Sequence, residues 1–399
     1  MKTTSPEISY EYIYLLRLIR SVVNKTDAEL PEEPVNWRNL YNIAAAHSLS
    51  AMLYEAVEKL PQEHKPDKNI LAYLAQLYRE QIVTDINLTV ETERVLSLFS
   101  QKGIEAMAFK GIVTKNDYPK NYLRTMSDVD ILIKEDKREA AEQILLDEGY
   151  KRESVGVKDS SYRKDRILHF EIHCNLLEED AYGFEYFSRI WDRAEQKDNT
   201  GFAMSLEDTY LFMLEHLSNH LLFGGAGLRM YLDVYLFLKN HKSQLNRDYV
   251  NSVLSKLELS EFEVETIKLA DSFFSPLSKY DGDFRTETFI LGLSTFGSRD
   301  VYYAANAVKS QGSSSARNGL KIILSKVFPS FKSLKLKYKA VKSVPLLYPV
   351  FIPVFWFERA FLRRNINAGS ISSYFVSSDS QKAKELKDLY ISLGLEKRL

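Results

Sequence analysis

Two aspartates one residue apart, Asp128 and Asp130, have the types and spacing of a cation site. They lead into the apolar run at 131–133, which predicts that they lie at the start of a β-strand. Side chains two positions apart on a strand point to the same side, so the two carboxylates should lie close together and repel each other. A cation removes that repulsion, and such oxygen-rich sites suit Mg²⁺, with Mn²⁺ as a substitute. A solvated strand entry with two exposed acids is the alternative.

A candidate anion site precedes the aspartates at Lys110 and Gly111. Residues 106–109 are small and apolar and predict a short buried strand, and Gly111 predicts a turn that opens a helix. Free backbone N–H groups at such a turn can bind an anion, and the Lys110 ammonium adds positive charge. An ordinary strand-to-helix turn with a surface lysine is the alternative.

Further strands are expected after a helix over 134–149, which Gly149 would cap. Two strands are predicted at 151–157 and 161–166, and a third at 167–175. In the third, His169, Glu171 and His173 alternate with apolar residues and share one face. Glu171 is therefore a candidate third carboxylate. His173 is expected to hydrogen-bond a carboxylate or contact a phosphate, unless it is purely structural. The two histidines around Glu171 also leave a zinc site open.

This order of elements resembles the nucleotidyltransferase core of the DNA polymerase beta superfamily, and more closely the uncharacterised nucleotidyltransferases, type 5. The matching residues are Lys110-Gly111, Tyr118-Pro119, Arg124, Ser127, Asp128, Asp130, Gly149-Tyr150, Glu171, His173, Glu207-Asp208, His216, His220, Leu228-Arg229 and Asp233, with Phe328-Pro329, Tyr338, Pro353, Trp356 and Arg359 towards the C-terminus. The superfamily's usual Gly-Ser before the helix is replaced by Lys110-Gly111. The implied fold is α+β, with a small mixed-sheet core flanked by N- and C-terminal helical segments.

The resemblance implies transfer of a nucleoside monophosphate from a nucleoside triphosphate to a hydroxyl acceptor, with release of pyrophosphate. Asp128, Asp130 and Glu171 would hold two metal ions, which clamp the attacking and leaving oxygens. The nucleotide-binding candidates are Lys110, Gly111, Arg124 and Ser127. A structural salt bridge from Arg124 to Asp128 or Asp130 is the alternative for that arginine.

The identity of both substrates stays open. No residue selects a base, so ATP is expected only by default, and the acceptor could be a protein, a metabolite, a sugar or an RNA end. A non-catalytic module that holds a nucleotide or another anion on the same fold is the alternative function. The presence of all three candidate carboxylates argues against a decayed active site.

A helix is predicted to begin after Ser205, which has the residue type of an N-cap. Its His216 and His220 lie one turn apart and are expected to line a cleft between domains, with two structural histidines as the alternative. The glycine-rich run at 224–227 predicts a connection between helices rather than a phosphate loop. Beyond it, Arg229 and Asp233 predict an ion pair on a helix surface, with a cleft role as the alternative.

Four regions are expected along the chain: a helical N-terminal region at 1–100, an α/β core at 101–200, a helical domain at 201–310, and a basic, proline-containing C-terminal region with a terminal helix at 311–399. Asn36 is predicted to cap one helix of the first region, and a long helix is expected over 69–100. Ser260 and Glu263 predict a capping box, residues 311–316 a flexible connector, and residues 380–393 the terminal helix.

The overall composition is that of an ordinary soluble globular protein, with 45% hydrophobic and 27% charged residues. The net charge of -1 gives no general attraction to nucleic acid. The one cysteine, Cys174, cannot form an internal disulfide, and the first residues lack a signal-peptide pattern. A cytoplasmic protein is therefore expected.

A basic stretch at 317–364 is hidden by this balance, because Glu358 is its only acid. It predicts an anionic partner such as RNA or a membrane surface, with a merely solvated face as the alternative. Within it, residues 344–357 are almost wholly apolar but too short and proline-rich for a transmembrane helix. Packing of this run against the core is the preferred prediction, and a position on a membrane surface is the other.

Overall fold

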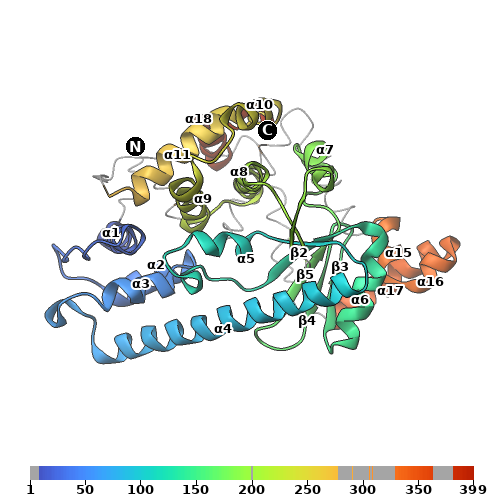
Figure 1. The fold of residues 1–399 in the computed structure, drawn as a ribbon, viewed down its shortest axis with the longest axis horizontal. Coiled ribbons are helices and arrows are strands. Elements are labelled where there is room, and N and C mark those ends of the chain that lie inside the picture. The colour runs from blue at the N-terminus through green and yellow to red at the C-terminus, as the bar shows by residue number, and fades with distance from the viewer. Residues whose placement is uncertain are drawn as a thin grey trace.

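The computed structural model describes residues 9–198, 201–276, 290, 305, 308, 329–362 and 381–399. Its centre is a seven-stranded mixed sheet with helices on both faces (Figure 1). The fold is α+β, as predicted. The strands are β1 (Ala106–Phe109), β2 (Val129–Ile133), β3 (Lys151–Val155), β4 (Asp159–Arg163), β5 (His169–His173), β6 (Glu195–Asp198) and β7 (Gly201–Ala203).

The strand order is β3-β4-β5-β2-β1-β7-β6. The two central strands for the site are β2 and β5, which run parallel, while β1 pairs antiparallel with β2 on the other side. The predicted strands are confirmed, with ends shifted by a few residues. The hairpin of β6 and β7 was not predicted, because Glu195–Asp198 is wholly polar and its strand conformation comes from pairing with β7, which in turn pairs with β1.

One face of the sheet is covered by α4 (Lys68–Gln101) and α6 (Arg138–Asp147). Their apolar side chains form a core with alternate residues of the central strands. Its members include Leu88, Val95, Phe99, Val129, Ile131, Ile133, Ala141, Leu145, Phe170 and Ile172. The long helix predicted over 69–100 is confirmed. The helix predicted from 134 begins later, after a 3₁₀ turn at Glu135–Lys137, and such turns are frequent at helix N-termini.

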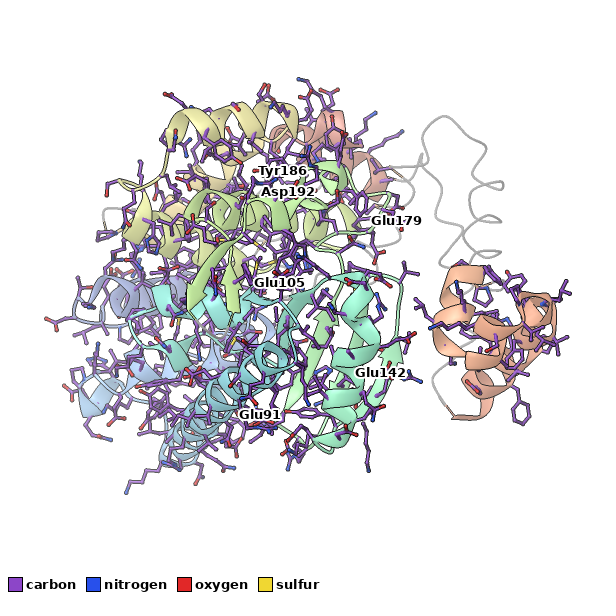
Figure 2. The ribbon with its side chains drawn as sticks, turned by 45° about the vertical axis from the view of Figure 1, so that its right-hand side comes forward. Glu91, Glu105, Glu142, Glu179, Tyr186 and Asp192 are labelled. Atoms are coloured by element: carbon purple, nitrogen blue, oxygen red, sulfur yellow. The ribbon has the colours of Figure 1, made fainter. Side chains whose placement is uncertain are left out.

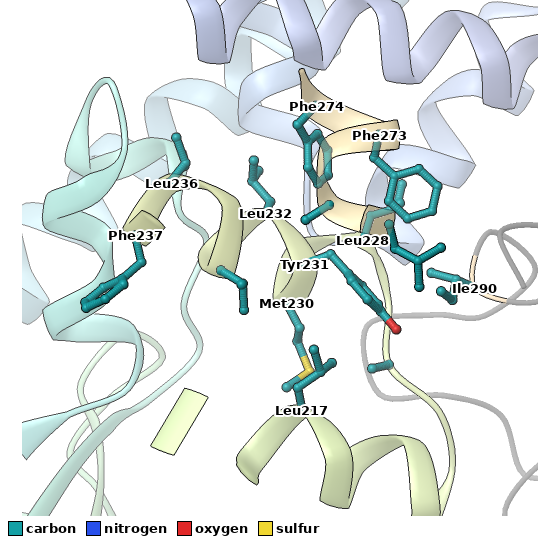
Figure 3. Packing of buried hydrophobic residues seen from close by; sticks show 14 of the residues in the cluster. Leu217, Leu228, Met230, Tyr231, Leu232, Leu236, Phe237, Phe273, Phe274 and Ile290 are labelled. Atoms are coloured by element: carbon teal, nitrogen blue, oxygen red, sulfur yellow. The ribbon is translucent and has the colours of Figure 1, made fainter. Parts of the chain in front are cut away.

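The opposite face meets a larger helical core. Its helices are α1 (Tyr10–Asn24), α2 (Trp37–Ala46), α3 (Ser50–Val57), α7 (Phe184–Phe187), α8 (Leu206–Phe223), α9 (Leu228–His241), α10 (Arg247–Lys256), α11 (Ser260–Phe274) and α18 (Gln381–Ser392). The short helix α5 (Gly111–Thr114) follows β1, and its Ile112 belongs to the core beneath α4. The 3₁₀ turns lie at Gln62–His64, Lys115–Asp117, Asn121–Leu123, Ile190–Asp192 and Glu396–Arg398. Figure 3 shows α8, α9 and α11 meeting through side chains such as Leu217, Tyr231 and Phe273. Strand residues Met107, Phe109 and Leu132 belong to this core.

The predicted helix starts have mixed outcomes. Asn36 and Ser205 cap α2 and α8, because their side chains accept hydrogen bonds from Asn39 N and Asp208 N. The capping box at Ser260 is wrong, since Leu259 is the N-cap residue and makes no side-chain cap. Glu263 instead accepts hydrogen bonds from Tyr210 Oη at 2.7 Å and Arg247 Nη1 at 2.9 Å. These partners from other helices replace the local bond.

The C-terminal segment forms α15 (Phe331–Lys337), α16 (Lys339–Ser343), a 3₁₀ turn (Pro345–Leu347) and α17 (Tyr348–Leu362). Across 329–362, no residue from 344 to 357 is buried, so the preferred prediction that this run packs into the core is wrong. The expected connector at 311–316 lies outside the described residues. The terminal helix is confirmed as α18, whose Leu386 and Tyr390 join the main core. Within the part of the chain that is described, no helix is long and apolar enough to cross a membrane.

Candidate active site

The candidate carboxylates Asp130 and Glu171 lie on the sheet face next to α8. Val129 and Ile131 of β2 point into the core beneath α4, so Asp130 between them points to the opposite side. The register of the parallel strands places Asp130 opposite Glu171 of β5. Phe109 of β1 contacts the His173 ring, with ring centres 5.1 Å apart. The two carboxylates are therefore held side by side by strand pairing and not by a loop.

Asp130, Glu171 and His173 form the group of described residues that could hold a metal ion, with one ligand atom from each lying within 4.8 Å of the others. His173 Nε2 lies 2.8 Å from Asp130 Oδ1 and 3.5 Å from Glu171 Oε2. Asp128 is outside this close group but lines the same cavity. His169 turns towards Glu153 instead, at 3.7 Å, and is no part of the group, which removes the basis for the zinc interpretation.

The three carboxylates have different affinities for protons. Burial acts to raise the pKa of Asp130, but the Lys110 ammonium and the hydrogen bond to His173 outweigh it, so that pKa is lowered. The hydrogen bond to His173 lowers the pKa of Glu171 against burial and the charge of Asp130. Burial, followed by repulsion from Asp130 and Glu171, raises the pKa of Asp128. The site thus gathers negative charge that only nearby cations offset.

Lys110 supplies that positive charge within the protein. Its Nζ lies 2.6 Å from Asp130 Oδ1, and Asp130 raises the pKa of Lys110 against the opposing effect of burial. The backbone of Lys110 has φ 55° and ψ -129°, a conformation that is costly for any residue with a side chain. Strain of this kind persists only where the surrounding structure imposes it. The sequence predicted contact with a triphosphate, and the structure brings Lys110 to the carboxylate of Asp130.

Gly111 follows at a position where a side chain has no room. A Cβ atom there would lie 2.4 Å from Arg124 Nη1 and 2.7 Å from Met126 Sδ. Glycine therefore allows Arg124 and the residues before Asp128 to approach the turn between β1 and α5. This close approach places the predicted nucleotide-binding residues Lys110, Gly111 and Arg124 in the wall of one cavity.

Arg124 is fixed by a partner that the sequence did not predict. Its Nε and Nη2 donate to the two carboxylate oxygens of Asp233 at 3.1 and 2.8 Å, and Tyr118 Oη donates to the same carboxylate at 2.7 Å. The alternative of a salt bridge from Arg124 to Asp128 or Asp130 is therefore wrong. The predicted ion pair between Arg229 and Asp233 is also wrong, because this tertiary contact takes the carboxylate.

Arg229 has a different role on the same helix. Its Nη1 donates to the Thr125 carbonyl oxygen at 2.8 Å. Together, the Arg124 and Arg229 contacts tie the segment before Asp128 to α9. Ser127 follows this segment, and its Oγ donates to Asp128 Oδ1 at 3.3 Å. Helix α9 thereby positions Asp128.

A cavity of about 310 Å³ opens between this face of the sheet and α8 and α9. All of the predicted site residues except His173 line it, and His173 lies directly beneath Asp130 and Glu171. Four methionines form much of the apolar wall and were not singled out in the sequence, because they come from separate segments. They are Met126, Met204, Met213 and Met230. Thioether side chains adapt to ligands of different shape.

The two histidines of α8, His216 and His220, line the same cavity. That this cavity lies between two domains stays a prediction. The two histidine ring centres are 4.5 Å apart. Burial and the nearby cations Lys110 and Arg229 lower the pKa of His220 to about 4, and burial lowers that of His216 well below its usual value. Both imidazoles are therefore neutral at about pH 7.

A family model described as uncharacterised nucleotidyltransferase matches residues 33–275. The chain belongs to this family. No curated protein and no solved structure matches it. The matched range runs from before α2 to the end of α11, so it includes the whole sheet and every residue that lines the cavity.

Proposed function

We propose that this nucleotidyltransferase moves a nucleoside monophosphate from a nucleoside triphosphate, ATP by default, to a hydroxyl acceptor. The observation that carries the proposal is the pairing of Asp130 with Glu171 on adjacent strands, beside Asp128 and Lys110 in one cavity. Two lowered carboxyl pKa values keep the negative charge that a divalent cation requires. The family assignment supports nucleotidyl transfer as the reaction that uses it.

The donor atoms fit Mg²⁺, or Mn²⁺ in its place. Asp130, Glu171 and Asp128 offer carboxylate oxygens, which are the ligands that a hard cation prefers. His173 orients Asp130 through the 2.8 Å contact, since carboxylates that bind a metal are themselves held by hydrogen-bond partners. When bound, the metal would supply charge neutralisation at the reacting phosphate and lower the pKa of the attacking hydroxyl.

The remaining cavity residues bind and orient the triphosphate in this proposal. Lys110 is positioned to exchange its carboxylate partner for phosphate oxygens once a cation neutralises Asp130. The Nε–Nη2 edge of the Arg124 guanidinium is occupied by Asp233, which leaves Nη1, above Gly111, for a phosphate. Ser127 Oγ adds a hydroxyl donor beside Asp128. Positioning and charge stabilisation of this kind are the main requirements of phosphoryl-type transfer.

The reaction proposed is an in-line displacement at the α-phosphorus. The acceptor oxygen forms a bond to that phosphorus, the bond to the bridging oxygen of the β-phosphate breaks, and pyrophosphate leaves. The hydroxyl proton passes to a carboxylate of the site. The methionine wall and the neutral histidines would receive the uncharged parts of the substrates, since an apolar wall suits a flat base. We also propose a cytoplasmic location, because the buried Cys174 is a free thiol.

A transfer assay tests this function directly. The protein is mixed with each α-³²P-labelled nucleoside triphosphate, Mg²⁺ or Mn²⁺, and a lysate of its host as the source of acceptor. Asp130→Asn is the inactive control, and Asp136→Asn, on the exposed turn before α6, is the matched control. The proposal is supported if label moves into a protein, RNA or small-molecule fraction with the wild type and with Asp136→Asn, but not with Asp130→Asn. Nucleotide binding without any Asp130-dependent product favours the non-catalytic binding module.

A further inference from the structure

Helix α17 has one face that is already used for packing. Tyr348 Oη donates to the Pro329 carbonyl oxygen at 2.9 Å, and the Phe351 ring centre lies 4.8 Å from that of Tyr338. Lys337 Nζ lies 4.9 Å above the Phe355 ring and 2.7 Å from Glu358 Oε2. These positions, spaced by three or four residues, form the face of α17 that packs against α15 and the start of α16.

The other face of this segment is apolar and exposed. Leu346 is 87% exposed and Val350 58% exposed, and Val354 follows one turn later. Spacing by four residues places the three side chains in one stripe. The exposed Val344 and Phe331 lie in the same segment. In Figures 1 and 2 the α15–α17 helices lie at one side of the molecule, away from the cavity helices α8 and α9. An exposed apolar stripe of this kind marks an interaction surface.

The charge around this stripe has a single sign. From residue 329 to residue 357 every charged residue is a lysine, and the first acid is Glu358. The five lysines are Lys332, Lys335, Lys337, Lys339 and Lys342. Lys335 is exposed one turn after Phe331 on α15, while Lys342 bonds to Glu139 of α6 and attaches the segment to the body of the protein. Lysines beside exposed aliphatic side chains complement an anionic surface that also has an apolar layer.

We propose that the α15–α17 segment docks on the surface of a membrane that contains anionic lipid. The stripe of Leu346, Val350 and Val354 enters the boundary between head groups and acyl chains, and the exposed Lys335 contacts the head groups. RNA is a poorer fit, because aliphatic side chains gain little from bases that stack on aromatic rings. A second copy of the chain is a poorer fit because it would bring like charges together. The proposal does not depend on nucleotidyl transfer.

Vesicle flotation of the full-length protein tests the proposal. The vesicles contain phosphatidylcholine with phosphatidylserine, or phosphatidylcholine alone, at low and high salt. The double variant Leu346→Asp/Val350→Asp removes the stripe. Its matched control is Ile86→Asp/Val90→Asp on α4, where the replaced side chains are 56% and 60% exposed. Lys335→Glu tests the charge, with Lys102→Glu at an exposed position before β1 as its control.

The expected result is flotation with the phosphatidylserine vesicles that weakens with salt. The stripe variant should lower the partition coefficient by about tenfold or more, and Lys335→Glu by about fivefold or more, while both controls bind as the wild type does. Absence of wild-type flotation at low salt overturns the proposal. An equal loss of vesicle binding in the stripe variant and in its α4 control also overturns it. The proposal fails too if the stripe is required for binding of single-stranded RNA or for self-association but is not required for vesicle binding. Thermal unfolding curves of the variants establish that each is folded.

Discussion

Lys110 Nζ lies 2.6 Å from Asp130 Oδ1. Its positive charge therefore neutralises a carboxylate that the proposed metal ion would also bind. The lysine is the residue with positive φ at the end of β1, and the aspartate lies on the neighbouring strand β2. Adjacent strands therefore hold both the acidic site and an internal cation that competes for it. In the proposed function, metal and nucleotide binding separate this pair, which gives Lys110 two opposing effects.

Lys110→Ala should change metal and nucleotide affinity in opposite directions. Without the competing ammonium, Mn²⁺ should bind the free protein several-fold more tightly, because Asp130 and Glu171 then lack their internal cation. Nucleoside triphosphate should bind about tenfold more weakly, through loss of a charge-assisted phosphate contact. Mn²⁺ titration followed by electron paramagnetic resonance and calorimetry with nucleotide measure the two constants. Lys134→Ala, which removes a surface ion pair with Glu105, should change neither. Unchanged nucleotide affinity in Lys110→Ala would contradict the proposed role.

Asp128→Asn and Asp130→Asn should both abolish transfer but should change stability in opposite directions. The raised pKa of Asp128 means that its ionised form is disfavoured in the folded protein, so asparagine should raise the metal-free free energy of unfolding. The lowered pKa of Asp130 means that its charge stabilises the fold above its unfolded pKa, so asparagine should lower the free energy of unfolding. Urea unfolding near neutral pH, together with the transfer assay, checks both signs. Transfer at the wild-type rate in either variant refutes the site.

The acidic group could be predicted because its information is local. Alternation along two strands placed Asp128 with Asp130, and Glu171 with His173, on single faces. The pairing of β2 with β5, which brings Asp130 beside Glu171, is a finding of the structure. The partner of Arg124 could not be predicted in this way, because Asp233 lies on α9, far along the chain. The i, i+4 spacing of Arg229 and Asp233 suggested a helix-surface pair, but Arg124 and Tyr118 bind the carboxylate more directly.

The outer parts of the fold were predicted less well for two physical reasons. The β6–β7 hairpin has no apolar alternation, and only its pairing with β1 makes it a strand. The apolar run at 344–357 was expected to be buried because hydrophobic residues usually are. Its aromatic residues Tyr348, Phe351 and Phe355 do pack, but against α15 and Tyr338, and this leaves Leu346 and Val350 exposed. Sequence composition alone does not distinguish a core from an exposed docking stripe.

Gly111→Ala should reduce transfer because the added methyl group displaces Arg124 and Met126. We expect a loss of about 1–3 kcal/mol in the free energy of unfolding and about tenfold or more in kcat/KM. Gly103→Ala is the control, since its φ of 65° imposes strain but no atom lies within 4 Å of the added group. That variant should lose about 1 kcal/mol of stability and retain full activity. Equal activity of the two variants would show that the space at Gly111 is not required.

Asp233→Asn should destabilise the protein strongly, because it leaves the Arg124 guanidinium buried without its counter-charge. The two side chains are 10% and 8% exposed, and breaking such a pair from one side costs about 3 kcal/mol or more. Asp192→Asn breaks an ion pair with Arg189 in which both side chains are largely exposed, and should cost less than about 0.5 kcal/mol. Urea midpoints at a fixed m-value measure the difference. Similar midpoints for the two variants would mean that the Arg124–Asp233 contact is not a buried structural pair.

His220 should make the stability of the protein fall as the solution becomes acidic. Its pKa is lowered from 6.5 to about 4 in the folded protein. Between these values the unfolded chain binds a proton that the folded chain does not, so the unfolded state gains roughly 1.4 kcal/mol per pH unit from this group as the pH falls. His220→Gln should therefore flatten the acid-side decline in the free energy of unfolding by about that slope. His64→Gln, in the short turn Gln62–His64 away from the cavity, is the control. The free energy of unfolding is measured by urea unfolding from about pH 7 to about pH 4.5. If it falls equally steeply in the wild type and in His220→Gln, the cavity does not exclude the imidazolium form of His220.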